Sequence, residues 1–269
     1  MGIKHKINED FFKTWDSTMA YVLGFIYADG SVHQSARGNY LVVTSTDKHI
    51  IVGIKRWMGS EHIIGKKSFT DNRKPQYAIR IGNKEIYKDL LGLGVYPNKS
   101  LTARMPRNIP RPVLKDFVRG YFDGDGCVYL YRTKGLMRKM ILRQLKIIFT
   151  SGSQNFLNDL LEVLREGLSL RLTCSYTSKR SYQLRFSTQD SVALFKFMYN
   201  DVPAGAFFPR KFDVFRKYFI LRPQRVDKEV EMILRYVSGG HVAKEIRDGL
   251  QNRYTRVRIP SWPHMVNGE

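Results

Sequence analysis

Cysteine, acidic residues and long apolar runs are all scarce in this sequence of 269 residues. Its 2 cysteines, Cys127 and Cys174, have neither the paired spacing of a zinc site nor the density of a secreted disulfide scaffold. We therefore expect two free thiols in a reducing compartment, either cytoplasm or an organelle matrix. The longest apolar runs fall far short of the roughly 20 residues that span a bilayer. The first residues, MGIKHK, lack the apolar stretch of a secretory signal, so we expect a soluble protein with no membrane partner.

Basic residues greatly outnumber the acidic ones. The chain has 45 Lys and Arg against 24 Asp and Glu, which gives a formal net charge of +21. This excess goes beyond what solubility requires and indicates a polyanionic partner. Charge by itself does not separate DNA from RNA or from an acidic membrane surface. The motifs must decide between these partners.

One pattern is written twice along the chain. AYVLGFIYADG at residues 20–30 and DFVRGYFDGDG at residues 116–126 are both apolar runs closed by an acidic residue and glycine. Each is followed by a strand pattern, a Ser, Thr or Asp cap and an amphipathic helix pattern. Further on, QYAIRIG at residues 76–82 matches SYQLRFS at 181–187, and each half then reaches a lysine, Lys99 or Lys211. The shared order predicts duplication of one unit of about 100 residues.

Within each unit the pattern predicts helix, two strands, helix, two strands and helix. In the first half we expect helices at residues 17–28, 48–58 and 84–91 and strands at 31–35, 40–45, 63–69 and 76–81. Three prolines in MPRNIPRP, residues 105–112, predict the end of one unit and the start of the next helix, because proline is tolerated only in the first turn of a helix. The expected fold is therefore α+β, with two pseudo-symmetric αββαββα units at residues 1–105 and 106–222 and a helical tail at 223–269.

The tail leaves two alternatives open. Apolar stripes on both sides of Gly239-Gly240 and a basic segment at residues 252–259 are similar to a helix-turn-helix. A helical hairpin that packs on the second unit explains the same pattern equally well.

The two repeated apolar segments end in Asp29 and Asp125, each followed by glycine. A single Asp-Gly pair is ordinarily a turn in which glycine provides a positive φ. Each segment also contains an internal glycine, Gly24 or Gly120, which costs a helix about 1 kcal/mol relative to alanine and so indicates close helix packing. Paired helices would bring both carboxylates together where helix ends already carry partial negative charge. A hard divalent cation such as Mg²⁺ would resolve that conflict.

These segments, VLGFIYADG at residues 22–30 and VRGYFDGDG at 118–126, resemble the two motifs of single-chain LAGLIDADG homing endonucleases. The resemblance covers about residues 16–219. It implies that the motif helices form the interface between the units and that two saddle-like antiparallel sheets bind DNA. It also implies metal binding by Asp29 and Asp125, with the backbone carbonyls of Ala28 and Gly124 as further ligands. Asp123 matches another acidic motif position, but Tyr27 occupies that position in the first copy, so we do not assign it to catalysis.

The resemblance further implies an activity. The chain would act as a monomer on a long double-stranded DNA site, hydrolyse both strands with Mg²⁺ and leave short 3′ overhangs, while Ca²⁺ would occupy the sites without supporting cleavage. Lys99 and Lys211 match the catalytic basic residues that the family places near the scissile phosphates, where a cation stabilises developing charge. Many relatives also use a glutamine at a strand end to order solvent. Here Ser45 and Ser151 occupy the corresponding stretches, and that role stays unassigned.

Strands with alternating polarity predict the DNA-binding faces. Arg80 and Arg185 alternate with apolar residues in the matched strands, and polar residues alternate with apolar ones from residue 171 to 177. A basic sheet face suits the major groove, where some side chains contact phosphates and others contact base edges. We expect DNA contacts from Ser31, His33, Ser35, Arg37, Lys66, Arg80, Tyr129, Tyr131, Arg171, Thr173, Ser175 and Arg185.

Two other functions are compatible with the same resemblance. One known regulator family joins a LAGLIDADG-like domain to a helix-turn-helix and binds DNA without cleaving it, but its members typically lack the motif acids. An intron RNA maturase would use the same basic surface on structured RNA. An intein fits less well, because no splicing segment flanks the motifs, the sequence starts at Met1 and neither cysteine is terminal.

Overall fold

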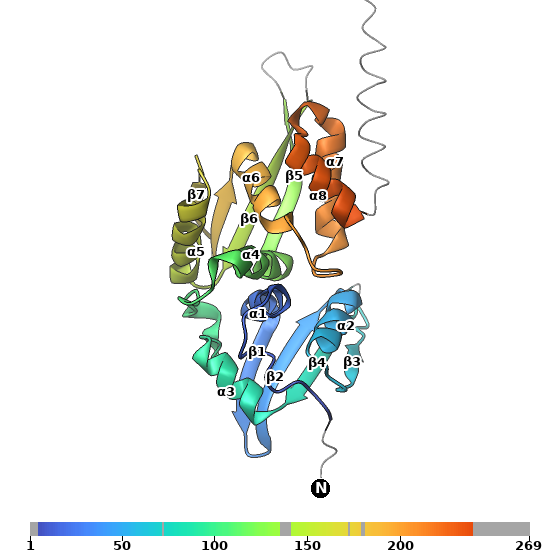
Figure 1. The fold of residues 1–269 in the computed structure, drawn as a ribbon, viewed down its shortest axis with the longest axis vertical. Coiled ribbons are helices and arrows are strands. Elements are labelled where there is room, and N and C mark those ends of the chain that lie inside the picture. The colour runs from blue at the N-terminus through green and yellow to red at the C-terminus, as the bar shows by residue number, and fades with distance from the viewer. Residues whose placement is uncertain (1–4, 72, 135–140, 172, 179–180, 239–269) are drawn as a thin grey trace, which may run out of the picture. The chain divides into compact units, whose positions relative to one another are not determined.

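The computed structural model describes residues 5–71, 73–134, 141–171, 173–178 and 181–238, without the side chains of residues 132–134, 141–143, 173–176 and 178. The chain divides into two compact units, residues 1–215 and 216–269. Figure 1 shows the two sequence repeats, and the first unit contains them as far as residue 215. The domain boundaries after residues 105 and 222 stay predictions.

The two repeats form the same series of elements. The first consists of α1 (Ser17–Asp29), β1 (Gly30–Ser35), β2 (Gly38–Ser45), α2 (Lys48–Trp57), β3 (Ile64–Lys67), β4 (Gln76–Gly82), α3 (Lys84–Gly92) and the short helix η1 (Lys99–Leu101). The second consists of α4 (Arg111–Asp125), β5 (Gly126–Lys134), β6 (Ile141–Ser151), α5 (Gln154–Gly167), β7 (Thr173–Ser178), β8 (Ser181–Phe186), α6 (Thr188–Tyr199) and α7 (Pro209–Leu221). The sheets are antiparallel and have matching orders, β1-β2-β4-β3 and β5-β6-β8-β7. The predicted duplication of an αββαββα unit is confirmed.

The second compact unit is described only in its first part. It contains the end of α7, the short helix η2 (Pro223–Arg225) and α8 (Lys228–Ser238). Helix α8 carries the first of the two apolar stripes of the tail, and its Val230, Ile233 and Leu234 are buried. The Gly239-Gly240 turn, the second stripe and the basic segment at 252–259 lie outside the described residues. Both alternatives for the tail stay open.

Local signals in the sequence explain where the helices start. The Asp16 side chain accepts a hydrogen bond of 2.7 Å from the Met19 N–H at the start of α1, and Ser153 caps α5 in the same way. These bonds satisfy N–H groups that have no partner within the helix. Helix α4 instead starts after Pro110, with Pro112 in its first turn, where a missing N–H costs nothing. The proline-rich link therefore ends one repeat and begins the motif helix of the next.

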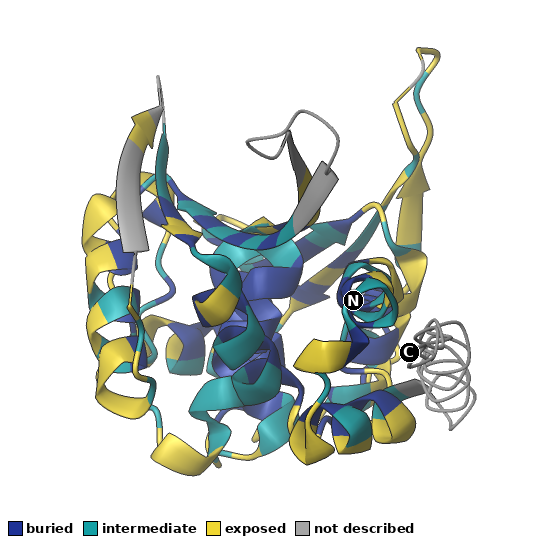
Figure 2. Ribbon diagram, turned by 90° about the horizontal axis from the view of Figure 1, so that it is seen from above, coloured by how far each residue is buried: buried dark blue, intermediate teal, exposed yellow. Residues whose placement is uncertain are grey.

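Each sheet has one buried face and one open face. In the first sheet Leu41 and Val43 of β2 and Ile79 and Ile81 of β4 are buried, whereas Arg80 between the last two is exposed. The second sheet buries Leu145, Ile147, Phe149, Leu184 and Phe186. This alternation is visible along the strands in Figure 2. Because α1 contacts β1 and β2, and α4 contacts β5 and β6, the motif helices lie against the buried faces.

Helices α1 and α4 pack against each other at their internal glycines. A Cβ atom added to Gly24 would lie 2.0 Å from the carbonyl oxygen of Phe117, and one added to Gly120 would lie 2.0 Å from that of Tyr21. No side chain fits at either position without separating the helix backbones. The close approach predicted from the two glycines is confirmed.

Two structural findings concern the short apolar runs and the cysteines of the sequence. Among the described residues, no helix combines the length and apolar character that crossing a bilayer requires. Cys127 is exposed and free, whereas the side chain of Cys174 lies outside the described ones.

Candidate active site

The motif aspartates are the last residues of α1 and α4. Because the helices cross at their glycines, these ends meet: a Cβ atom added to Gly124 would lie 2.3 Å from Cβ of Ala28 and 3.5 Å from Oδ2 of Asp29. Asp29 is half-buried and Asp125 is exposed. The structure thus brings the ends of the two helices, and with them the two carboxylates, to the same place.

The surroundings of the carboxylates disfavour their charged forms. Burial and then the negative charge of Asp125 raise the pKa of Asp29 to about 6, against the opposing effect of Lys211 and Lys99. Packing of the helix ends also raises the pKa of Asp125, although its side chain reaches the surface. Two carboxylates held in such a place are stabilised in their ionised form by a bound cation.

The glycines after the aspartates let each following strand start close to the last turn of its motif helix. Gly30 has a φ of −102° and Gly126 a φ of −86°, so neither occupies the left-handed region. A Cβ atom at Gly30 would lie 2.7 Å from Cα of Ile26, and one at Gly126 would lie 2.3 Å from the ring of Phe122. The first residues of β1 and β5 therefore pack directly against the last turn of α1 and α4, respectively. This arrangement differs from the positive-φ turn that a single Asp-Gly pair suggests.

A buried lysine binds each motif helix end. The Lys99 ammonium donates a hydrogen bond of 2.7 Å to the carbonyl of Gly30. The Lys211 ammonium donates to the carbonyls of Gly126 and Asp123, at 2.6 and 2.8 Å, and also to that of Phe122. Carbonyl oxygens at a helix C-terminus carry partial negative charge, which a nearby ammonium stabilises.

The two lysines are pseudo-symmetric equivalents with perturbed acidity. Lys99 and Lys211 are only 5% and 6% exposed. Burial lowers the pKa of both, that of Lys211 to about 8, while nearby carboxylates, including Asp29, oppose this effect. Each motif aspartate thus lies near cations contributed by both halves of the chain.

The donors at this site are oxygen atoms. Among the described residues, no group of three or more His, Cys, Asp or Glu side chains could hold a metal ion, so ligation here needs backbone or solvent oxygens besides the two carboxylates. The carbonyls of Ala28 and Gly124 are next to them in the chain, and the missing side chain at Gly124 keeps the space beside Asp29 clear. An all-oxygen donor set with two carboxylates fits hard ions such as Mg²⁺ and Ca²⁺.

A small pocket of about 60 Å³ lies beside Asp125, and Ala28, Tyr121 and Ser151 are among its lining residues. The Tyr121 hydroxyl donates a hydrogen bond of 2.8 Å to the carbonyl of Thr150. The pocket is polar and large enough for water. Ser151 therefore adjoins space for solvent.

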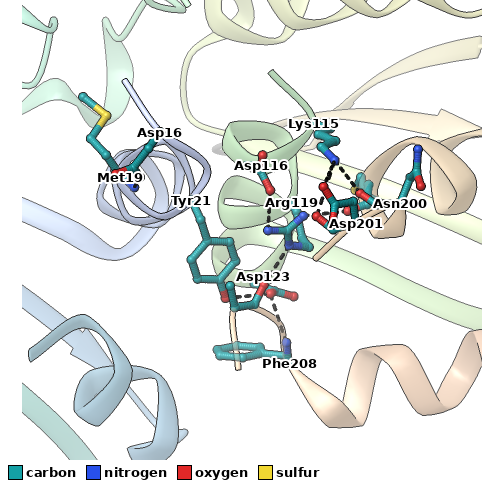
Figure 3. A network of polar contacts seen from close by, with 12 residues as sticks. Asp16, Met19, Tyr21, Lys115, Asp116, Arg119, Asp123, Asn200, Asp201 and Phe208 are labelled. Carbon is teal, nitrogen blue, oxygen red and sulfur yellow. Dashed lines mark hydrogen bonds and ion pairs between the residues drawn. The ribbon is translucent and has the colours of Figure 1, made fainter. Parts of the chain in front are cut away.

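Asp123 belongs to a buried polar network behind the two helix ends (Figure 3). Its Oδ2 accepts hydrogen bonds from the Tyr21 hydroxyl at 2.8 Å and from the Phe208 N–H at 3.0 Å. Burial raises the pKa of Asp123 to about 6. The side chain is wholly buried, whereas Asp125 is exposed, which supports leaving Asp123 out of the catalytic set.

Arg119 completes this network and was not predicted from the sequence. It is wholly buried, and its guanidinium donates to Oδ1 of Asp116 at 2.6 Å and to the carbonyls of Ala206 and Met198, both at 2.7 Å. These bonds attach α4 to α6 and to the loop that leads to Lys211. The available signal was an arginine three residues after an aspartate, within the apolar stretch that precedes the motif aspartate.

Most of the predicted DNA contacts lie where a ligand could reach them. The register places Ser31 opposite Val42, which in turn lies opposite the exposed Arg80, so all three share the open face. Arg37 is exposed between β1 and β2. On the open faces are also His33 and Ser35 in the first sheet and Tyr129, Tyr131 and Arg185 in the second.

The open face of the first sheet carries a stack of three side chains. The rings of His33 and Tyr40 stack at 5.2 Å, and the guanidinium of Arg80 lies 4.0 Å from the Tyr40 ring. In the second sheet Arg185 instead donates to Oε1 of Gln183 at 2.8 and 3.0 Å. Tyr40 and Gln183 were not predicted as contacts. The contact of Tyr40 with Arg80 depends on strand register, whereas Gln183 lies two residues before Arg185 in the same strand, a spacing that is visible in the sequence.

The strand register does not place the remaining predicted contacts on an open face, and their part in DNA binding stays a prediction. Lys66 pairs with Tyr77 in β4, on the side of the buried Ile79. The side chains of Thr173 and Ser175 lie outside the described ones, but their positions pair with Phe186 and Leu184, which are buried. The Arg171 guanidinium donates to Oε1 of Gln189 at 3.3 Å and its backbone N–H donates to Oδ1 of Asp190 at 2.8 Å, and both partners belong to α6. β3 and β7 are edge strands, where polar residues are tolerated on either face, so alternation alone does not identify the open one.

Known proteins share the repeated sequence of this chain. The family described as LAGLIDADG-like domain matches residues 16–92 and 112–197. An uncharacterized protein of Methanocaldococcus jannaschii is 25% identical over 130 residues, which cover 46% of either chain. A probable translation initiation factor IF-2 of Thermococcus kodakarensis is 30% identical over 158 residues, which cover 55% of this chain and 12% of that protein. The chain thus matches less than half the length of these curated relatives.

Solved structures share the fold. The LAGLIDADG meganuclease I-AabMI bound to uncleaved DNA has a TM-score of 0.54 at 12% identity, covering 81% of this chain and 97% of its own. The meganuclease I-SmaMI bound to uncleavable DNA has a TM-score of 0.53 at 14% identity, covering 82% and 97%. At these identities the likeness establishes the fold. Because the family match includes both repeats and more than half of the chain, this protein belongs to the LAGLIDADG-like family as a two-motif member.

Proposed function

We propose that the protein is a site-specific double-strand DNA endonuclease that requires a divalent metal ion. The observation that carries the proposal is the meeting of Asp29 and Asp125 at paired helix ends, each near a buried lysine. The open sheet faces, which start directly after these aspartates, supply cations and aromatic rings for DNA. A single chain has both halves of this arrangement, so the active form is a monomer.

The chemistry assigns separate tasks to the residues of the site. Asp29 and Asp125, with the carbonyls of Ala28 and Gly124, hold the metal. A divalent ion bound there would activate a water molecule and stabilise charge on the scissile phosphate. Lys99 and Lys211, fixed by the carbonyls of Gly30 and Gly126, stand ready to stabilise charge on phosphate oxygens. Their rigid attachment keeps the ammonium groups in place before DNA arrives.

The proposed substrate is a long DNA site cut with short 3′ overhangs, as the family resemblance implies. Mg²⁺ is the proposed cofactor, and Ca²⁺ supports binding without cleavage. I-SmaMI has been solved bound to an uncleaved DNA target in the presence of calcium ions, which supports this choice of ions. Both motif acids are intact, which favours a nuclease over a regulator without cleavage.

The test is a selection of cleaved DNA. The full chain is incubated with a randomised duplex library in Mg²⁺, and the cut ends are sequenced. We expect one long sequence, spanning about two helical turns, with cuts on both strands near its centre. Enrichment of bound but uncut duplex would favour a regulator. Absence of any enriched duplex, together with tight binding of structured intron RNA, would favour a maturase.

We predict that Arg80→Ala and Arg185→Ala weaken binding to opposite halves of that site. Both residues lie on open faces, in different sheets, and losing a good arginine contact to a base costs about 1–3 kcal/mol. Affinities for targets substituted in one half at a time measure this effect. Lys66→Ala is the matched control, since Lys66 faces the helix side and its loss should spare both halves. Equal losses across the site for either arginine would mean that the assignment of faces is wrong.

A further inference from the structure

The two halves of the site differ at the residue before the buried lysine. Arg210 precedes Lys211, whereas Asn98 precedes Lys99. Asn98 directly precedes η1 and has a φ of 60°, a left-handed conformation that asparagine tolerates well. Arg210 lies in the first turn of α7. A third cation is therefore added in one half of an otherwise pseudo-symmetric site.

The Arg210 side chain is held across the two halves. Its Nε donates a hydrogen bond of 2.9 Å to Oδ2 of Asp47, which precedes α2 in the first half, and its guanidinium lies 4.9 Å from the ring of Phe208. The side chain is still 56% exposed. Because the bond to Asp47 uses Nε, the remaining guanidinium nitrogens provide a fork of N–H donors. A fixed guanidinium with an exposed fork suits binding of a phosphate.

Arg210 joins the active site through its neighbour in the chain. The ammonium of Lys211, which follows it, donates hydrogen bonds to the carbonyls of Asp123 and Gly126 at the end of α4. Arg210 itself is bonded to Asp47 of the first half, so it lies at the edge of a site to which both halves contribute.

We propose that Arg210 binds the scissile phosphate of one DNA strand, so that the two strands are cleaved at different rates. The proposal rests on the nuclease function proposed above. The guanidinium binds a non-bridging phosphate oxygen and stabilises its negative charge as the phosphodiester bond is broken. Asn98 carries no charge with which to do this for the other strand. The bond to Asp47 orients the guanidinium before the DNA binds.

The test follows each strand separately. A duplex with the selected target carries a different label on each strand, and single-turnover cleavage in Mg²⁺ is measured for wild type and Arg210→Ala. We expect one strand to be cut about 10-fold more slowly or worse in the variant, while the other keeps nearly its wild-type rate. Nicked DNA therefore accumulates. A second readout needs no cleavage: in Ca²⁺, losing one phosphate contact lowers the slope of log affinity against log salt by about 0.9.

Arg104→Ala is the matched control. Arg104 is 58% exposed and donates two bonds of 2.8 Å to Asp159, so its loss breaks a comparable exposed ion pair. This control should leave the ratio of the two strand rates unchanged. Asp47→Asn keeps the cation of Arg210 while weakening its anchor, and should retain the wild-type salt slope.

The outcomes separate this proposal from the function on which it rests. Equal slowing of both strands by Arg210→Ala, or an unchanged salt slope, contradicts phosphate binding by Arg210. Its role would then be structural, as a link between α7 and the residue before α2. Equal losses of thermal stability in Arg210→Ala and Asp47→Asn, with no change in strand ratio, lead to the same conclusion. Failure of the wild type to cut any duplex overturns the proposed function, and this inference with it.

Discussion

Asp29→Asn and Asp125→Asn should each reduce cleavage of both strands by at least about 100-fold. The two carboxylates meet at one place, where Asp125 raises the pKa of Asp29, so losing either charge weakens metal binding for the shared site. DNA binding should survive, because it depends on the sheet faces and on a formal net charge of +21. Removing a carboxylate from a surface that attracts phosphates leaves affinity unchanged or raises it slightly.

The measurement uses a selected target, with Mg²⁺ for cleavage and Ca²⁺ for binding. Glu166→Gln is the control, since it removes the same charge from an exposed residue at the end of α5 and should change neither quantity. Near-normal cleavage by either aspartate variant would remove that residue from the active site. Loss of binding together with cleavage would instead indicate a folding defect, which thermal unfolding detects.

Gly24→Ala and Gly120→Ala should each destabilise the protein by about 3 kcal/mol or more. The new methyl group would lie 2.0 Å from a backbone carbonyl oxygen of the facing helix, so no rotamer change relieves the contact. Alanine favours a helix over glycine by only about 1 kcal/mol, which does not offset the separation of α1 from α4. Cleavage should also fall, because the same crossing brings Asp29 to Asp125.

Denaturant unfolding and single-turnover cleavage measure these two effects. Gly92→Ala is the control, because a Cβ atom at that position in α3 has no atom within 4 Å. It should leave stability unchanged or slightly increased. If Gly24→Ala or Gly120→Ala were as stable as this control, the helices would not cross at the glycines.

The elements and the meeting of the aspartates could be predicted from the sequence because each depends on local patterns that are repeated. Mid-helix glycines such as Gly24 have a cost that close packing explains, and the second copy at Gly120 places the partner. From that crossing the position of both aspartates follows. The expected helices at residues 17–28 and 48–58 agree with α1 and α2 to within one residue at each end.

The remaining features depend on register and tertiary contact. Lys66 and Ser175 pair with residues on the covered faces of their sheets, and in an edge strand polarity does not reveal which side the helices cover. The stack of Tyr40 with Arg80 requires strands to be aligned. Arg210 meets Asp47 although 163 positions separate them, and no local pattern encodes that distance. Burial of Lys99 and Lys211 against helix ends likewise appears only in the folded chain.

The most direct measurement of the central claim is linearisation of a supercoiled plasmid that carries the selected target. With one chain per target in Mg²⁺, the wild type should cut both strands at a rate that is first order in the monomer, and EDTA should abolish the reaction. The double variant Asp29→Asn with Asp125→Asn should bind the plasmid in Ca²⁺ but leave it supercoiled in Mg²⁺. The account would be contradicted by folded wild-type protein that binds this target in Ca²⁺ and leaves it intact in Mg²⁺, or by cleavage that persists in the double variant.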